Sequence, residues 1–165
     1  MTNNMEKNLN TNSIALAGEF FTLGQLALRG LDANMTLGHT KSVDILVSSP
    51  STGKMSRLEV KTTNTKPTKS TLFGFNYHWI MGEKHETITD KDLYYCFVLL
   101  NGPEIRYFVV PSVEVAKYVK DQHQIWLKQD PSHKDGSMRT FRIGCGNDSH
   151  GLAIDKWENK FDLLE

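Results

Sequence analysis

Residues Ser42–Thr63 read SVDILVSSPSTGKMSRLEVKTT and predict a β-hairpin. The segments Ser42–Val47 and Arg57–Lys61 largely alternate polar and apolar residues, as strands with one buried face do. Between them, Ser48–Gly53 consists only of Ser, Pro, Thr and Gly, which favour turns. We therefore expect two antiparallel strands that form the centre on which the rest of the chain is organised.

The register of this hairpin decides which side chains share a face. In the pairing that places Ile45 opposite Leu58 on an apolar side, Asp44 lies opposite Glu59 on the other side, and Lys61 shares that side. Directly opposed side chains have Cβ atoms roughly 4.5–5.5 Å apart, and like charges so placed destabilise the pair. A divalent cation between the carboxylates, with the lysine aimed at an anionic substrate, would account for the arrangement.

A second interpretation of the same residues stays open. Antiparallel hairpins commonly have one solvated face that carries Asp, Glu and Lys. A shift of the register by one residue would also exchange the two faces. Leu46 on the polar side favours a face that is partly covered.

The order of these residues resembles the PD-(D/E)xK nuclease superfamily, most closely its Holliday-junction-resolvase-like and restriction-endonuclease-like branches. Asp44 is followed, after fourteen residues, by Glu59-Val60-Lys61, and a predicted helix carrying Gly18-Glu19 precedes them. The matching stretch runs from about Ala17 to Thr63, a third of the chain. One departure is Val43, which stands where the family name has a proline.

The resemblance implies an α/β protein with a restriction-endonuclease-like core, αβββ followed by further strands and helices, in which helices flank a mixed central sheet. It implies a Mg²⁺-dependent endonuclease that hydrolyses phosphodiester bonds in nucleic acid, with DNA as the first expectation and Mn²⁺ as a substitute metal. The metal ligands it implies are Asp44, Glu59, the main-chain carbonyl of Val60, and Glu19. The catalytic residues are Asp44, Glu59, Lys61 and Glu19. Junction-cutting members are commonly dimers, so the resemblance is compatible with a homodimer.

Length and composition are those of one globular domain. The chain has 165 residues, a formal net charge of zero and 39% hydrophobic residues. We expect a disordered N-terminal tail over residues 1–12 and a single nuclease-like domain over residues 13–165. The two cysteines, Cys96 and Cys145, are widely spaced, which predicts free thiols in a cytoplasmic protein. The sequence has no apolar signal peptide and no membrane-spanning stretch, so we expect no membrane partner.

Basic residues gather around the hairpin. Between Lys41 and Lys69 there are six basic residues, and the two acids in this segment, Asp44 and Glu59, are the proposed ligands. Lys66 and Lys69, in a predicted loop after the hairpin, are candidates for contacts to a phosphate backbone. In the aromatic run that follows, Tyr77, His78 and Trp79 are expected to be the more exposed positions, and His78 is a candidate phosphate contact. The six histidines show no zinc-binding spacing, and the other five are expected at the surface.

The remaining segments alternate between helix and strand patterns. The expected elements are a helix over Ser13–Arg29, with Glu19 at the edge of its apolar face, an edge strand over Leu31–Gly38, strands over Asp92–Leu100 and Ile105–Val110, a helix from Ser112 through about Gln129, a strand over Met138–Ile143, and a last helix over Ile154–Leu164. Glu19 is expected either to join the metal site or its surroundings, or to pair with a lysine at the surface.

Two functions other than a nuclease are compatible with the sequence. One is a non-catalytic module that binds nucleic acid or forms a complex and retains the fold. The other is an unrelated interaction protein in which the acidic residues and the lysine are a solvated face.

Overall fold

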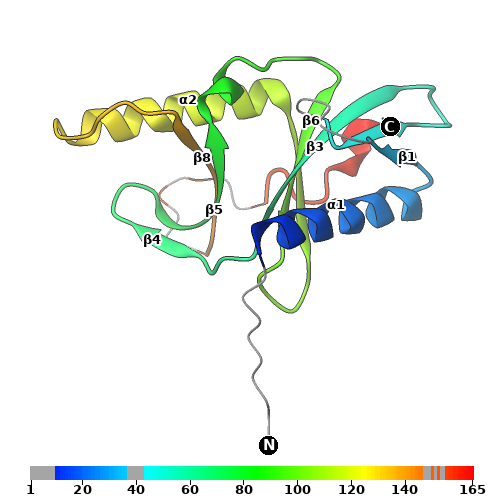
Figure 1. The fold of residues 1–165 in the computed structure, drawn as a ribbon, viewed down its shortest axis with the longest axis horizontal. Coiled ribbons are helices and arrows are strands. Elements are labelled where there is room, and N and C mark those ends of the chain that lie inside the picture. Colours follow the sequence, from blue (N-terminus) through cyan, green and yellow to red (C-terminus); the bar gives the residue numbers. More distant parts are fainter. Residues whose placement is uncertain (1–9, 37–42, 147–149, 151, 153–154) are drawn as a thin grey trace, which may run out of the picture.

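The computed structural model describes residues 10–36, 43–146, 150, 152 and 155–165. They form a five-stranded sheet, in the order β1-β2-β3-β6-β7, and a three-stranded sheet, in the order β4-β5-β8 (Figure 1). The helices, strands and short 3₁₀ helices (η) are α1 (Thr11–Leu28), β1 (Asp32–Met35), β2 (Ile45–Ser48), β3 (Met55–Thr63), β4 (Thr68–Ser70), β5 (Gly74–Gly82), η1 (Glu83–Glu86), β6 (Leu93–Leu99), β7 (Arg106–Pro111), α2 (Ser112–Gln129), β8 (Met138–Gly144) and η2 (Phe161–Leu164).

The predicted hairpin is present as β2 and β3. The two strands are antiparallel and Ile45 lies opposite Leu58, which is the predicted register. The paired ladder ends at this point, however, because β2 begins at Ile45. Asp44 therefore lies one residue outside the strand. Beyond Leu58, the edge of β3 that faces β2 has no strand partner, and we call this stretch the open edge of β3. In place of the expected pairing with Glu59, the Asp44 side chain contacts the Val60 main chain at this open edge.

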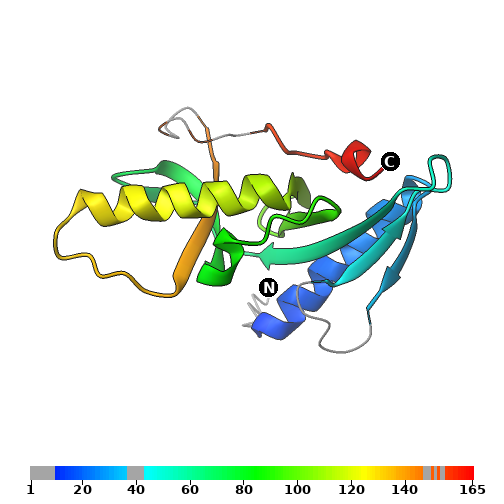
Figure 2. The ribbon, with the colours of Figure 1, turned by 90° about the horizontal axis from the view of Figure 1, so that it is seen from above.

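The five-stranded sheet is mixed, as predicted. β3 pairs in parallel with β6, whereas the other neighbouring pairs in this sheet are antiparallel. Every residue of β6 is buried, in agreement with its almost continuous apolar sequence. α1 covers one face of the sheet, and α2 with the three-stranded sheet covers the other (Figure 2). The fold is thus a mixed central sheet flanked by helices.

Helix α1 begins two residues earlier than predicted. Its N-cap is Asn10, because the Asn10 side chain accepts a hydrogen bond from the Ser13 main-chain N–H at 2.7 Å. Thr11 and Asn12, expected in the disordered tail, are therefore helical, and the rest of that tail, residues 1–9, lies outside the described residues. The helix ends as predicted before Gly30, whose positive φ of 73° favours glycine.

The aromatic run forms β5, and its most buried ring is one that we expected at the surface. Trp79 is 2% exposed, and its Nε1 donates a hydrogen bond to the Val98 carbonyl at 3.2 Å. Its ring lies between the two sheets, near Phe97 and Phe141. Alternation along β5 places Trp79 on the side that faces β6.

The predicted loop before β5 is also partly wrong, because it contains the short strand β4.

The predicted last helix is wrong over most of its length. Residues 153–154 lie outside the described residues, and residues 155–160 form turns before the single 3₁₀ turn of η2. Glu158 makes an isolated β-bridge with Phe108 and its carboxylate pairs with Arg106 at 2.7 Å. Asn159 has a positive φ of 55°. The segment forms turns against β7 in place of a helix, because its main chain hydrogen-bonds to that strand at Trp157 and Asn159.

Within the part of the chain that is described, no helix is long and apolar enough to cross a membrane. Cys96 and Cys145 are free thiols, and Cys96 is buried as predicted.

Candidate active site

The open edge of β3 brings two oxygen ligands of the predicted set together. The Asp44 N–H donates to the Leu58 carbonyl at 2.9 Å. The Asp44 carboxylate in turn accepts a hydrogen bond from the Val60 N–H at 2.7 Å. In a β-strand the N–H and C=O of one residue point to the same side, so the Val60 carbonyl is directed toward the same edge. Asp44 and the Val60 carbonyl therefore share the edge that β2 leaves open.

The Glu59 carboxylate is buried beside this edge. Glu59 is 3% exposed, and Lys61 Nζ lies 2.6 Å from its Oε1. The other carboxylate oxygen, Oε2, is buried and forms no well-aligned hydrogen bond among the described residues, although the Tyr95 hydroxyl interacts with the Glu59 carboxylate. A buried carboxylate oxygen that lacks a well-aligned partner is costly, and such an atom is available as a ligand for a cation.

Two further side chains extend this site, and we did not predict either of them. Tyr95 in β6 lies directly beside Glu59 in the parallel register. Its hydroxyl is 2.7 Å from Nδ1 of His85, a residue that is 2% exposed. Burial raises the pKa of Tyr95, and the neighbouring negative Glu59 carboxylate raises it further. The expectation that His85 is a surface residue is therefore wrong, and so is the same expectation for His123, which is buried in α2. In the sequence, Tyr95 is an aromatic residue inside a buried strand. This pattern does not show that Glu59 lies next to it on β3.

Glu19 approaches the site from α1. Gly18 packs so closely on β3 that a Cβ atom at this position would lie 1.9 Å from Thr62 Oγ1. This contact places Glu19 near the open edge. Burial raises the pKa of Glu19 and the charge of Asp44 raises it further, whereas Lys61 lowers it. The pKa of Asp44 is raised as well, mainly by burial and to a smaller extent by the Glu59 charge. The hydrogen bond from the Val60 N–H and the charge of Lys61 act in the opposite direction.

The donor atoms fit Mg²⁺, although they do not form a cage of three acidic side chains. Among the described residues, no three His, Cys, Asp or Glu side chains gather closely enough to hold a metal ion. A metal here would depend on Asp44, Glu59, the Val60 carbonyl and water. Mg²⁺ prefers hard oxygen ligands and retains several waters, and Glu59 Oε2 is an acceptor without a well-aligned partner among the described residues. Glu19 as a direct ligand stays a prediction.

The three predicted substrate contacts lie in or next to the three-stranded sheet. Lys66 precedes β4, Lys69 lies within it, and both are exposed. His78 in β5 is half-buried, and its Nδ1 is 3.5 Å from Thr68 Oγ1. Burial and the charge of Arg142 lower the pKa of His78, which favours its neutral form near pH 7. The role of these residues in substrate binding stays a prediction.

Comparison with known proteins finds a structural relative. No protein-family model matches the sequence, and no curated protein sequence matches it. Among solved structures, the fold is similar to that of a bacterial homing endonuclease, I-Ssp6803I, with a TM-score of 0.56 and 10% sequence identity. The match covers 94% of this chain and 93% of that chain. At this identity the similarity shows the fold alone, which the two chains share over nearly their whole length.

Proposed function

We propose that this protein is a metal-dependent nuclease that hydrolyses phosphodiester bonds in DNA. The observation that carries the proposal is the buried Glu59 carboxylate beside the Asp44 carboxylate at the open edge of β3. One oxygen of Glu59 is paired with Lys61, and the other has no well-aligned partner among the described residues. The similarity of the fold to a homing endonuclease supports the same reaction class. The order of Glu19, Asp44, Glu59 and Lys61 along the chain supports assignment to the PD-(D/E)xK superfamily.

The proposed chemistry follows from the charges at the edge of β3. Bound Mg²⁺ would polarise the scissile phosphate and acidify a water molecule. Asp44, Glu59 and the Val60 carbonyl would hold the ion. The Lys61 ammonium has three donors, one of which is used by Glu59. The others can stabilise the negative charge that develops on phosphorus oxygens. The attacking water would lose its proton to an oxygen of the substrate phosphate.

A cleavage assay with matched variants tests this proposal. We expect the wild-type protein to cleave plasmid or branched DNA with Mg²⁺ or Mn²⁺ and to lose this activity in a chelator. Lys61→Ala and Asp44→Ala should each lower the rate by about 10²-fold or more, because each removes charge from the reacting centre.

The controls are Lys117→Ala and Asp121→Ala, which change exposed residues on α2 far along the chain from the hairpin. Both should cleave at the wild-type rate. Equal behaviour of the wild type and of both site variants on every substrate would overturn the proposal.

A non-catalytic module that binds nucleic acid is the second candidate. The observation that favours it is that no group of three acidic, His or Cys side chains able to hold a metal is found among the described residues. DNA binding that is unaffected by chelator, without cleavage in any metal, would favour this candidate.

A further inference from the structure

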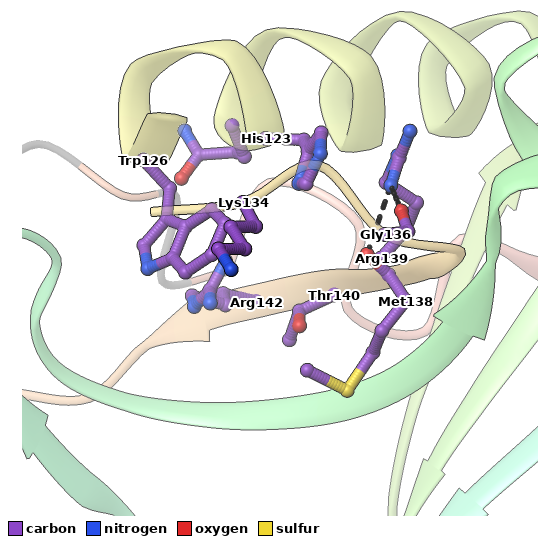
Figure 3. Close-up of a pocket in the computed structure, with 9 residues that line it drawn as sticks. His123, Trp126, Lys134, Gly136, Met138, Arg139, Thr140 and Arg142 are labelled. Atoms are coloured by element: carbon purple, nitrogen blue, oxygen red, sulfur yellow. Dashed lines mark hydrogen bonds between the residues drawn. The ribbon is translucent and has the colours of Figure 1, made fainter. Parts of the chain in front are cut away.

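A cavity lies between α2 and β8, away from the candidate active site. None of the proposed catalytic residues lines it. Its volume is about 220 Å³, and it is bordered by Gln122, Trp126, Lys134, Met138, Thr140 and Arg142 together with His123, Gly136 and Arg139 (Figure 3). An engineered protein cavity of about 150 Å³ is large enough for benzene. This cavity therefore has room for a small organic molecule.

Two of the cations that line this cavity have no acidic partner among the residues that the structure describes. Arg139 pairs with Glu86, and His123 Nε2 is 2.8 Å from Asp135. By contrast, no Asp or Glu oxygen of the described chain forms an ion pair with Lys134 or Arg142. Lys134 and Arg142 lie at the same end of the cavity, beside Trp126 (Figure 3).

The Arg142 guanidinium is held in a partly desolvated place. It lies 4.1 Å from the centroid of the Phe73 ring. Burial lowers the pKa of Arg142, and no carboxylate of the described residues forms an ion pair with it. A guanidinium stays charged in proteins, so a desolvated one next to an open space favours an anion in that space.

The walls of the cavity supply an acceptor and apolar surface. The Oε1 atom of Gln122 is buried and has no hydrogen-bond partner among the described residues. The Trp126 indole is fixed by stacking on His133, with ring centroids 4.0 Å apart. The Met138 side chain lies at the opposite end from Lys134 (Figure 3). A ligand that satisfies these groups has an anionic end, a partly apolar body and an N–H or O–H donor for Gln122.

We propose that this cavity binds a phosphate monoester with a compact organic body, such as a mononucleotide. A phosphate monoester carries a charge of about −1.5 to −2 at pH 7, which matches Lys134 and Arg142 together. A carboxylate or an internal phosphodiester carries only one negative charge. The same monoester group occurs on a free nucleotide and at the phosphorylated end of a nucleic-acid strand. The proposal does not rest on the nuclease reaction, since it uses different residues.

Isothermal titration with thymidine 5′-monophosphate, which has both the phosphate and an N–H donor, tests the site. The titration is run on the full chain in a chelator. We expect saturable binding that is at least about tenfold weaker for thymidine. Lys134→Gln and Gln122→Met should weaken binding about fivefold or more, since each removes one recognition group. Arg142→Gln is a third variant, used if thermal unfolding shows that it folds.

Lys128→Gln is the matched control, because Lys128 is exposed on α2 and does not line the cavity. It should bind as the wild type does, and so should Lys61→Ala. Binding that survives Lys61→Ala while all DNA cleavage assays fail would support this site and count only against the nuclease. The proposal is overturned by no binding up to about 10 mM, by equal affinity for thymidine, by unchanged affinity in Lys134→Gln and Gln122→Met, or by loss of binding in Lys61→Ala.

Thymidine tetranucleotides with and without a 5′-phosphate distinguish the two sources of the ligand. Preference for the phosphorylated strand over the unphosphorylated one supports recognition of a strand end. Binding of thymidine 5′-monophosphate with no binding of either tetranucleotide supports a free nucleotide.

Discussion

At the scale of single residues, the candidate active site depends on side chains that reach it from both sides of Glu59. Lys61 pairs with one oxygen of the carboxylate, and the Tyr95 hydroxyl lies on the other flank in contact with His85. His85 is buried, and burial lowers its pKa to about 4. The histidine is therefore neutral in the folded protein near pH 7, and its ring links η1 to the centre of the sheet without adding charge next to Lys61.

The buried His85 makes a specific contribution to the pH dependence of stability. The pKa of His85 is 6.5 in the unfolded chain and about 4 in the folded protein, so the unfolded chain binds the proton more readily between these values. Stability should therefore fall as the pH is lowered from about 6.5 to 4, by roughly 3 kcal/mol from this residue. We therefore expect the free energy of unfolding of His85→Gln to fall less than that of the wild type over this pH range.

Urea unfolding of the two proteins at pH 7, 5.5 and 4 measures the difference. Asp44 and Glu19, whose raised pKa values act in the opposite direction, are present in both proteins, so their contributions cancel. A loss of stability of the same size in wild type and His85→Gln would show that this histidine is not responsible.

At the scale of elements, the contact between α1 and β3 decides where Glu19 lies. Gly18 and Gly24 are both in the interior of α1, where glycine costs helix stability. A Cβ at Gly18 would collide with Thr62, whereas a Cβ at Gly24 would meet no atom of the described residues within 4 Å. Packing among the described residues thus requires the first glycine and not the second. The close approach at Gly18 brings the helix N-terminal half, and with it Glu19, onto the strand that carries Glu59.

The two glycines should respond oppositely to the same substitution. Gly18→Ala should lower the free energy of unfolding by about 1–3 kcal/mol, because the added methyl group forces α1 away from Thr62. Gly24→Ala should raise it by about 0.5–1 kcal/mol through helix propensity. Urea unfolding of both variants measures these changes. Stabilisation by both substitutions would contradict the close packing of α1 on β3.

At the scale of the whole molecule, the C-terminal segment joins the parts of the fold on both faces of the main sheet. Phe161 and Leu164 are buried in the cluster between α1 and the sheet. Trp157 packs against the cluster formed with α2. Between them, the main chain pairs with β7, since Val109 N–H donates to the Trp157 carbonyl and Asn159 N–H to the Tyr107 carbonyl. The segment closes an edge of the sheet that would otherwise be open.

Truncation of a buried side chain in this segment should affect the entire domain. Phe161 is 1% exposed and packs against Tyr107 and the Arg29 guanidinium. We expect Phe161→Ala to lower the free energy of unfolding by about 3–5 kcal/mol. The control is Leu28→Ala, at a residue that is 81% exposed, with an expected change within about 0.5 kcal/mol. Thermal unfolding measures both, and a small effect of Phe161→Ala would mean that this segment is not part of the core.

The sequence by itself determined the local parts of this protein. Alternation and turn residues set the β2–β3 hairpin and its register, because both signals are contained in one short stretch. The helix pattern set the bounds of α2, and the glycine at position 30 set the end of α1. The candidate ligands Asp44 and Glu59 were found because their spacing follows from that register.

Only the tertiary structure decided what surrounds those residues. The parallel pairing of β3 with β6 places Tyr95 beside Glu59, and no local pattern encodes a pairing between strands so far apart in sequence. The cavity beside Trp126, the burial of His85 and the turns of residues 155–160 against β7 have the same origin. Each depends on free energy gained between distant segments, which overrides the weak local preferences by which a single sequence is interpreted.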